Sequence, residues 1–208
     1  MKLFHVLVEQ ILSENLIIPL QEGAINDFNK LISRNTGFLF LLAGSPRSGK
    51  SNFVDKFITP KQRGLVITNP DDIALMFTGD PNIHKRGSTN MSVKRSQAML
   101  KTRKDKLSFV YDSTGSDNTR LKTLADQAKQ NGYKVIVINV IAPLKVALDR
   151  NKKAARHVSV DYLVPAWKTA QANIKKLHQS IKPDFQFVAA SFDNKYVLYS
   201  YDGKKMNR

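Results

Sequence analysis

A glycine-rich segment carries the residue pattern that binds nucleotide phosphates. The sequence GSPRSGKS fills every fixed position of the Walker A pattern. Its residues are Gly44, Ser45, Pro46, Arg47, Ser48, Gly49, Lys50 and Ser51. Glycines let backbone N–H groups converge on phosphate oxygens, and a helix that follows presents its positive end to them. In this phosphate-binding loop (P-loop, residues 44–51), Lys50 is predicted to reach the β- and γ-phosphates of ATP and Ser51 to bind Mg²⁺.

Two adjacent carboxylates follow in the segment ITNPDDIALMF, residues 67–77. Asp71 and Asp72 stand where a predicted strand meets the next helix, and open α/β sheets bind ligands at that end of their strands. A carboxylate at this place could accept the proton of an attacking hydroxyl, as kinase chemistry requires. The alternative is structural, because an Asp after Pro commonly opens a helix as its N-cap.

A third carboxylate ends the next predicted strand, in FVYDSTGSDNTR, residues 109–120. Asp112 is a candidate for the substrate or metal site, and the alternatives are a helix cap or a buried hydrogen-bond acceptor. A P-loop alone does not separate kinases from GTPases, motor ATPases or nucleotide-binding proteins without chemistry. The rest of the chain must decide between them.

Apolar runs and turn residues predict an alternation of strands and helices around these motifs. Strands are expected at 38–42, 64–68, 107–111, 134–141, 185–190 and 196–201. Helices are expected near 50–57, 70–77, 90–104, 117–131, 143–152 and 160–180. Such alternation predicts a mainly parallel sheet with helices on both faces, the three-layer α/β sandwich of P-loop NTPases.

The first 36 residues show apolar side chains at three-and-four spacing, which predicts two amphipathic helices broken near Pro19. We expect residues 1–36 to form an N-terminal helical extension and residues 37–208 to form the P-loop domain. The extension is expected to pack against that domain, and the alternative is an arm that binds a partner.

The composition favours a polyanionic partner. The chain of 208 residues has 33 Lys and Arg against 17 Asp and Glu, a formal charge of +16. Nucleic acid is the leading partner, an anionic membrane is second, and a role in solubility alone is the alternative. The absence of Cys excludes disulfides, thiolate metal sites and cysteine nucleophiles. Glu9 and Gln10 interrupt the first apolar run, so we expect a cytoplasmic protein without a signal peptide or membrane span.

Taken together, residues 38–176 resemble the kinase domain of the bacteriophage polynucleotide kinase and zeta-toxin group of P-loop kinases. The resemblance rests on the Walker A segment, the Asn-x-Asp-Asp tetrad, the Asp-Ser-Thr segment and NGYKVIVINVIAPLKVALDRN at 131–151. It implies that Asp71 acts on the substrate hydroxyl, with Asp72 the less favoured candidate. It places Asp112 beside the substrate or the water shell of the metal, and lets Ser113 and Thr114 position substrate.

The resemblance also implies a lid that brings basic residues over the phosphates, in RNKKAARHV at 150–158. Arg150 matches directly and Arg156 matches if one residue is gapped, and their cations would neutralise charge on the transferred phosphoryl. The alternative is a solvated charge run. Ala74 stands where polynucleotide kinases of this kind usually carry an Arg that holds the substrate's phosphate. We also expect no C-terminal phosphatase domain.

The segment 84–108 is a candidate for gripping the acceptor. It holds Lys85, Arg86, Lys94, Arg95, Lys101, Arg103, Lys104 and Lys106 against one acid, Asp105. In a helix over 90–104, Lys94, Lys101 and Lys104 would share one face while Val93 and Leu100 pack inward. In related kinases this insertion lies over the acceptor site. We therefore expect Lys94 and Arg95 to bind phosphates without reading sequence, and the alternative is a solvated face without a ligand.

Three functions remain open, and the first is favoured. It is an ATP-dependent kinase that phosphorylates a hydroxyl of DNA or RNA, either a terminal 5′-OH or the hydroxymethyl group of a modified base. The second is a zeta-toxin-like kinase of a soluble nucleotide sugar, which needs no chain-long basic surface. The third is a nucleotide-dependent DNA-binding or virion protein in which the P-loop has no kinase activity.

Overall fold

A computed structural model describes residues 23–78, 86–102, 106–192, 195–202 and 206–207 of the chain. The helix expected near residues 4–12 and the expected break at Pro19 lie outside these residues. Within them, no helix combines the length and the apolar character that a bilayer crossing needs.

One mixed sheet runs through the molecule in the order β2-β3-β1-β4-β5-β6-β7. Its strands are β1 (Phe38–Ala43), β2 (Val66–Thr68), β3 (Phe109–Ser113), β4 (Lys134–Ile141), β5 (Phe185–Phe192), β6 (Lys195–Tyr201) and β7 (Met206–Asn207). The first five strands are parallel, and β6 and β7 add antiparallel pairs at one edge. The predicted α/β fold with a mainly parallel sheet is therefore confirmed.

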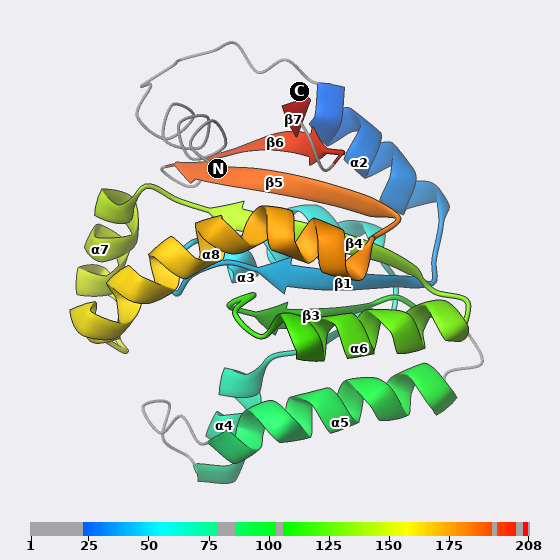
Figure 1. The fold of residues 1–208 in the computed structure, drawn as a ribbon, viewed down its shortest axis with the longest axis horizontal. Coiled ribbons are helices and arrows are strands. Elements are labelled where there is room, and N and C mark those ends of the chain that lie inside the picture. Colours follow the sequence, from blue (N-terminus) through cyan, green and yellow to red (C-terminus); the bar gives the residue numbers. More distant parts are fainter. Residues whose placement is uncertain (1–22, 79–85, 103–105, 193–194, 203–205, 208) are drawn as a thin grey trace.

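Helices cover both faces of this sheet, with α6 and α8 in front and α3 behind in Figure 1. The α-helices are α2 (Gly23–Arg34), α3 (Lys50–Phe53), α4 (Pro70–Thr78), α5 (Arg86–Thr102), α6 (Asn118–Gln130), α7 (Leu144–Lys153) and α8 (Val160–Ile181). The helix predicted over 50–57 is divided, because a π-helical turn (Val54–Ile58) and a 3₁₀ turn (Thr59–Lys61) follow α3. Pro60 lacks the N–H that an α-helix would need there.

The core follows from the apolar run of β1, which is buried on both of its faces. Phe38, Phe40 and Leu42 face one cluster, and the alternate residues face the other. Phe28 and Ile32 of α2 are fully buried in the first cluster. Helix α2 therefore packs against the sheet, while the division of the chain at residue 36 stays a prediction.

The parallel strands bring three loops to one edge of the sheet. Strand β1 lies beside β3, and Ala43 at its end pairs with Ser113 at the end of β3. Strand β3 in turn pairs with β2, which ends at Thr68 opposite Tyr111. The segments that leave β1, β2 and β3 therefore start side by side, and these are the segments that carry the candidate motifs.

Candidate functional site

The P-loop connects β1 to α3, and its backbone needs glycine at two points. A Cβ on Gly44 would lie 2.3 Å from the carbonyl oxygen of Val140 in the neighbouring strand β4, so only glycine fits. Gly49 has φ +98°, a left-handed conformation that glycine adopts without strain. Arg47 also has a positive φ, of 64°. The Walker A spacing therefore matches a tightly turned loop pressed against β4.

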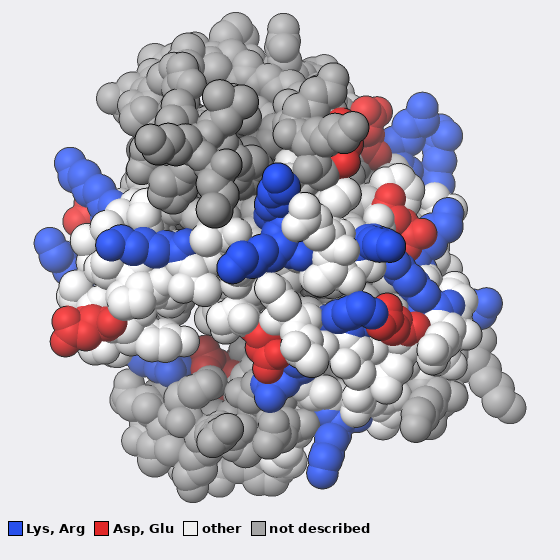
Figure 2. Space-filling view, in the orientation of Figure 1, with Lys and Arg blue, Asp and Glu red and all other residues white. Residues whose placement is uncertain are grey.

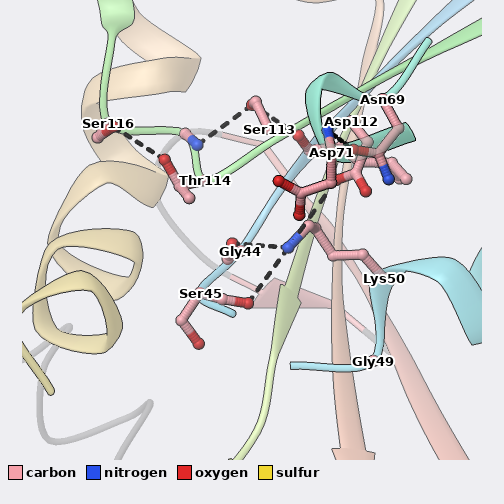
Figure 3. Close-up of polar contacts among 12 residues, drawn as sticks. Gly44, Ser45, Gly49, Lys50, Asn69, Asp71, Asp112, Ser113, Thr114 and Ser116 are labelled. Carbon is pink, nitrogen blue, oxygen red and sulfur yellow. Dashed lines mark hydrogen bonds and ion pairs between the residues drawn. The ribbon is translucent and has the colours of Figure 1, made fainter. Parts of the chain in front are cut away.

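Lys50 lies inside this turn (Figure 3). Its Nζ donates hydrogen bonds to the carbonyl oxygens of Gly44 at 3.0 Å and Ser45 at 3.2 Å. The same ammonium lies 3.8 Å from Oδ1 of Asp112, and both side chains are largely buried. The structure thus places the P-loop lysine against the carboxylate that ends β3.

Asp112 sits in an environment that disfavours its charge. Burial raises its pKa, the Lys50 ammonium opposes this, and the charges of Asp71 and Asp72 raise it further. These carboxylates are therefore close enough to interact electrostatically. Asp71 and Asp112, which follow β2 and end β3, thus lie on the same side of the sheet as the P-loop lysine (Figure 3).

Asp71 and Asp72 occupy the first turn of α4. The residue that caps this helix is Asn69, whose Oδ1 accepts a hydrogen bond from the Asp71 N–H at 2.9 Å (Figure 3). The carbonyl of Asn69 accepts the first helical bond from Ile73 N–H at 3.2 Å. Because Asn69 performs the capping, both carboxylates stay at the surface of the site. Burial and the charge of Asp71 raise the pKa of Asp72.

The loop between α7 and α8 (residues 154–159, the lid loop) reaches both the P-loop and α4. Nη1 of Arg156 lies 3.3 Å from Oδ2 of Asp71. The carbonyl of Arg156 accepts a hydrogen bond from Nη2 of Arg47, and Nε of Arg47 donates to Asn151 Oδ1 at 3.4 Å. Asn151 also exchanges two hydrogen bonds with the backbone of Val158, at 2.7 and 3.0 Å. The lid loop is thereby fastened beside the P-loop.

Arg150 approaches the P-loop from a different direction. Its Nη1 donates to the carbonyl of Arg47 at 3.2 Å and its Nη2 to the hydroxyl of Ser191 at 2.9 Å. The two arginines of the predicted lid therefore have different partners. One contacts the candidate base, and the other contacts the P-loop backbone.

The hydroxyls of Ser113 and Thr114 are engaged in the turn that follows β3. Ser113 Oγ donates to the carbonyl of Leu42 at 2.9 Å and accepts from Gly115 N–H at 3.2 Å. Thr114 Oγ1 pairs with Ser116 Oγ at 2.9 Å (Figure 3). Both residues lie at the edge of the site, where the turn fixes their hydroxyls.

Helix α5 packs against α4 and continues toward the opposite end of the sheet (Figure 1). Leu100 is buried and Val93 packs against the same cluster, as predicted from their spacing. Lys94 and Arg95 are exposed near the middle of the helix. Lys101 lies in its last turn, away from its contact with α4, and Lys104 lies outside the described residues.

The family model of the zeta toxin matches residues 24–204, which is most of the chain. The chain belongs to the zeta toxin family. The predicted grouping with P-loop kinases is thereby confirmed, and fold and family together support a phosphotransferase.

Solved structures share the fold of this zeta toxin family member. The AvrRxo1-ORF1:-ORF2 complex with ATP is 17% identical, with a TM-score of 0.63, over 90% of this chain and 68% of that chain. The PezAT toxin-antitoxin system of Streptococcus pneumoniae is 15% identical, with a TM-score of 0.56, over 88% and 81%. The Pnkp1/Rnl/Hen1 RNA repair complex is 19% identical, with a TM-score of 0.57, over 68% and 46%. No curated protein matches the sequence.

The residues of the site fit a magnesium ion that accompanies a nucleotide. Ser51 is exposed in the first turn of α3, and Asp112 Oδ1 is buried without a hydrogen bond within the described part of the chain. No cluster of three or more His, Asp or Glu side chains suited to a metal occurs among the described residues. Phosphate and water would therefore supply most ligands, as magnesium at nucleotide sites commonly requires.

Two residues beside the P-loop carry no motif and were not predicted. The Tyr196 hydroxyl in β6 donates a hydrogen bond to the carbonyl of Gly49 at 2.8 Å. The Ser191 hydroxyl in β5 accepts a hydrogen bond from Nη2 of Arg150. The available signal was weak, since Ser191 and Tyr196 only flank the segment between the strands predicted at 185–190 and 196–201. Their position next to Gly49 depends on how the β5–β6 hairpin packs.

Proposed function

We propose that this zeta toxin family member transfers the γ-phosphate of ATP to a hydroxyl of nucleic acid. The observation that supports it most is that two ion pairs lie together at the ends of β1, β2 and β3. Lys50 lies 3.8 Å from Asp112, and Arg156 lies 3.3 Å from Asp71. The first pair belongs to the P-loop and the second to the side where an acceptor would enter.

ATP would bind along the P-loop. Backbone N–H groups of residues 44–51 would donate to its phosphate oxygens, and Lys50 would exchange its two carbonyl partners for the β- and γ-phosphates. Magnesium would be held by the Ser51 hydroxyl directly and by Asp112 through its water shell. The ion would neutralise phosphate charge. One of the fold neighbours was solved with ATP, which agrees with this donor.

The acceptor hydroxyl would enter beside α4. Its oxygen forms a bond to the γ-phosphorus while the bond from that phosphorus to the bridging oxygen breaks, and ADP leaves with the electron pair. Asp71 receives the proton of the hydroxyl. The cationic side chains of Arg156 and Lys50 would contact the transferred phosphoryl and neutralise the charge that grows on it. Asp72, Ser113 and Thr114 would line the acceptor side, and Asp112 would lie where the acceptor side meets the P-loop.

The charge of the chain supports nucleic acid as the acceptor. Figure 2 shows Lys and Arg spread over one face of the molecule, with fewer Asp and Glu among them. Lys94 and Arg95 add exposed cations on α5, the helix that packs against α4. Backbone phosphates of DNA or RNA would bind such a surface without sequence preference.

A soluble nucleotide sugar is the second candidate acceptor, because the family match is to the zeta toxin. To separate the candidates, the protein is incubated with γ-labelled ATP and, in parallel, 5′-hydroxyl DNA, 5′-hydroxyl RNA, hydroxymethylated DNA and a mixture of nucleotide sugars. We expect label on a nucleic acid with the wild type and none with Lys50→Ala. Label on the sugars alone would support the second candidate. No label on any acceptor would contradict the kinase and leave a nucleotide-dependent binding protein.

A further inference from the structure

We propose that Tyr196 and Arg150 are positioning residues that hold the P-loop backbone in its phosphate-binding shape. This inference rests on the proposed function in one respect, namely that the P-loop binds a nucleotide. It assigns to the C-terminal hairpin β5–β6 a part in nucleotide binding that none of the sequence motifs carries. It also gives Arg150 a different task from Arg156.

Two carbonyls of the P-loop accept hydrogen bonds from side chains that lie outside the loop. Gly49 O accepts the Tyr196 hydroxyl at 2.8 Å, and Arg47 O accepts Nη1 of Arg150 at 3.2 Å. A trans peptide unit is planar, so its N–H points away from its C=O. The unit that contains Gly49 O carries the N–H of Lys50, and the unit of Arg47 O carries the N–H of Ser48. Holding these carbonyls therefore fixes the direction of two P-loop N–H groups.

The donating side chains form one connected group around Gly49. Tyr196 and Ser191 are paired across the β5–β6 hairpin, and Nη2 of Arg150 donates to Ser191 Oγ at 2.9 Å. A Cβ on Gly49 would lie 2.9 Å from the Tyr196 hydroxyl, 3.0 Å from Ser191 Oγ and 3.3 Å from Nη1 of Arg150. Three side chains from α7, β5 and β6 thus converge on one residue of the P-loop.

The ring of Tyr196 is also fixed by its neighbours. It is buried and meets Phe53 and Phe57 edge-on, with ring centroids 5.4 and 5.6 Å apart. Phe53 lies one turn beyond Gly49, and its N–H donates to the same carbonyl at 3.0 Å. Burial raises the pKa of Tyr196, so its hydroxyl keeps the proton that it donates. The hairpin therefore holds both the P-loop and the helix after it.

The test compares Tyr196→Phe, which removes only the hydroxyl, with Tyr201→Phe in the same strand at the other end of the sheet. Hydrogen–deuterium exchange of peptides covering residues 44–51 is measured without nucleotide, and the dissociation constant of Mg·ADP is measured separately. We expect Tyr196→Phe to accelerate the exchange and weaken Mg·ADP binding by about three- to tenfold, as the loss of one hydrogen bond predicts. Tyr201→Phe should change neither.

Arg150→Lys and Ser191→Ala provide a second route. Arg150→Lys keeps the charge but loses the planar fork that reaches two acceptors. It should therefore accelerate exchange of the P-loop amides. The KM for ATP should rise by a larger factor than kcat falls. Ser191→Ala should accelerate exchange at the same amides, since it frees one end of Arg150.

Exchange and Mg·ADP binding in Tyr196→Phe that equal those of Tyr201→Phe would overturn the proposal. A large fall in kcat with unchanged exchange in Arg150→Lys would show instead that Arg150 touches the transferred phosphoryl. The exchange measurement needs neither nucleotide nor acceptor, so it stays decisive even if the protein transfers no phosphate.

Discussion

The two halves of the site differ in how completely the fold prepares them. On the nucleotide side, Lys50 is only 13% exposed, and side chains from three elements hold the P-loop. On the acceptor side, the Asp71 side chain is 51% exposed, and Leu75 and Met76 extend the same exposed strip of α4. The proposed donor half is thus enclosed by the chain, while the proposed acceptor half is an open surface. This difference explains why the donor is easier to infer than the acceptor.

The contrast between the two halves of the site fails if phosphoryl transfer does not need Lys50. Lys50→Ala is expected to reduce phosphoryl transfer by about a thousandfold or more, because the γ-phosphate loses its fixed cation. Labelled-phosphate transfer and Mg·ADP binding check this, and both should weaken. Lys56→Ala, an exposed lysine beyond α3, is the control and should retain activity. Equal activity of the two variants would contradict the P-loop as donor site.

Asp71→Asn tests whether the two halves act separately. Transfer should fall by about a hundred- to ten-thousandfold, since the amide cannot accept the hydroxyl proton, while Mg·ADP binding stays unchanged. Single-turnover transfer and calorimetry measure the two effects. Asp72→Asn is the matched control and should lose less activity. A greater loss in Asp72→Asn would transfer the role of base to that residue.

The open acceptor surface is tested by replacing Lys94 and Arg95 with Ala together. If nucleic acid crosses α5, its affinity should fall by about tenfold. The slope of log affinity against log salt should become shallower by about one to two. Filter binding at several salt concentrations measures this. The pair Lys175 and Lys176, exposed on α8, provides a control of equal charge. An identical response of both pairs would remove α5 from the acceptor site.

The smallest expected effect concerns stability on the nucleotide side. Burial raises the pKa of Asp112, so the folded protein holds its proton more tightly than the unfolded chain and loses stability as pH rises through that pKa. Asp112→Asn should therefore raise the Tm at neutral pH, with a gain that shrinks as the pH is lowered. Asp126→Asn on exposed α6 should give no rise. A lower Tm for Asp112→Asn at neutral pH would show that its pairing with Lys50 outweighs the burial.

The sequence predicted the fold and the meeting of the candidate motifs at one edge of the sheet because that information is local. The P-loop, Asp71 and Asp112 each follow a short apolar run, and parallel strands necessarily bring such positions to one edge. Two strand starts were placed early, since β2 begins at Val66 and β3 at Phe109. Asn69, not an Asp, caps α4, because its amide oxygen reaches the Asp71 N–H.

Contacts between distant segments were beyond sequence reasoning. The Tyr196 hydroxyl meets a residue 147 positions earlier, and that meeting depends on the packing of the hairpin and two phenylalanines. The family resemblance put Arg150 and Arg156 in one lid but did not show that their side chains have different partners. The direction of α5 relative to the site likewise depends on its packing against α4 and α6.

A crystal structure with Mg²⁺ and a non-hydrolysable ATP analogue tests the central claim most directly. We predict the β- and γ-phosphates within hydrogen-bond distance of the P-loop N–H groups, with Lys50 Nζ moved from the carbonyls of Gly44 and Ser45 to the phosphates. Asp71 should then border the γ-phosphate from the acceptor side. A nucleotide bound elsewhere, with Lys50 still hydrogen-bonded to those two carbonyls, would contradict the account.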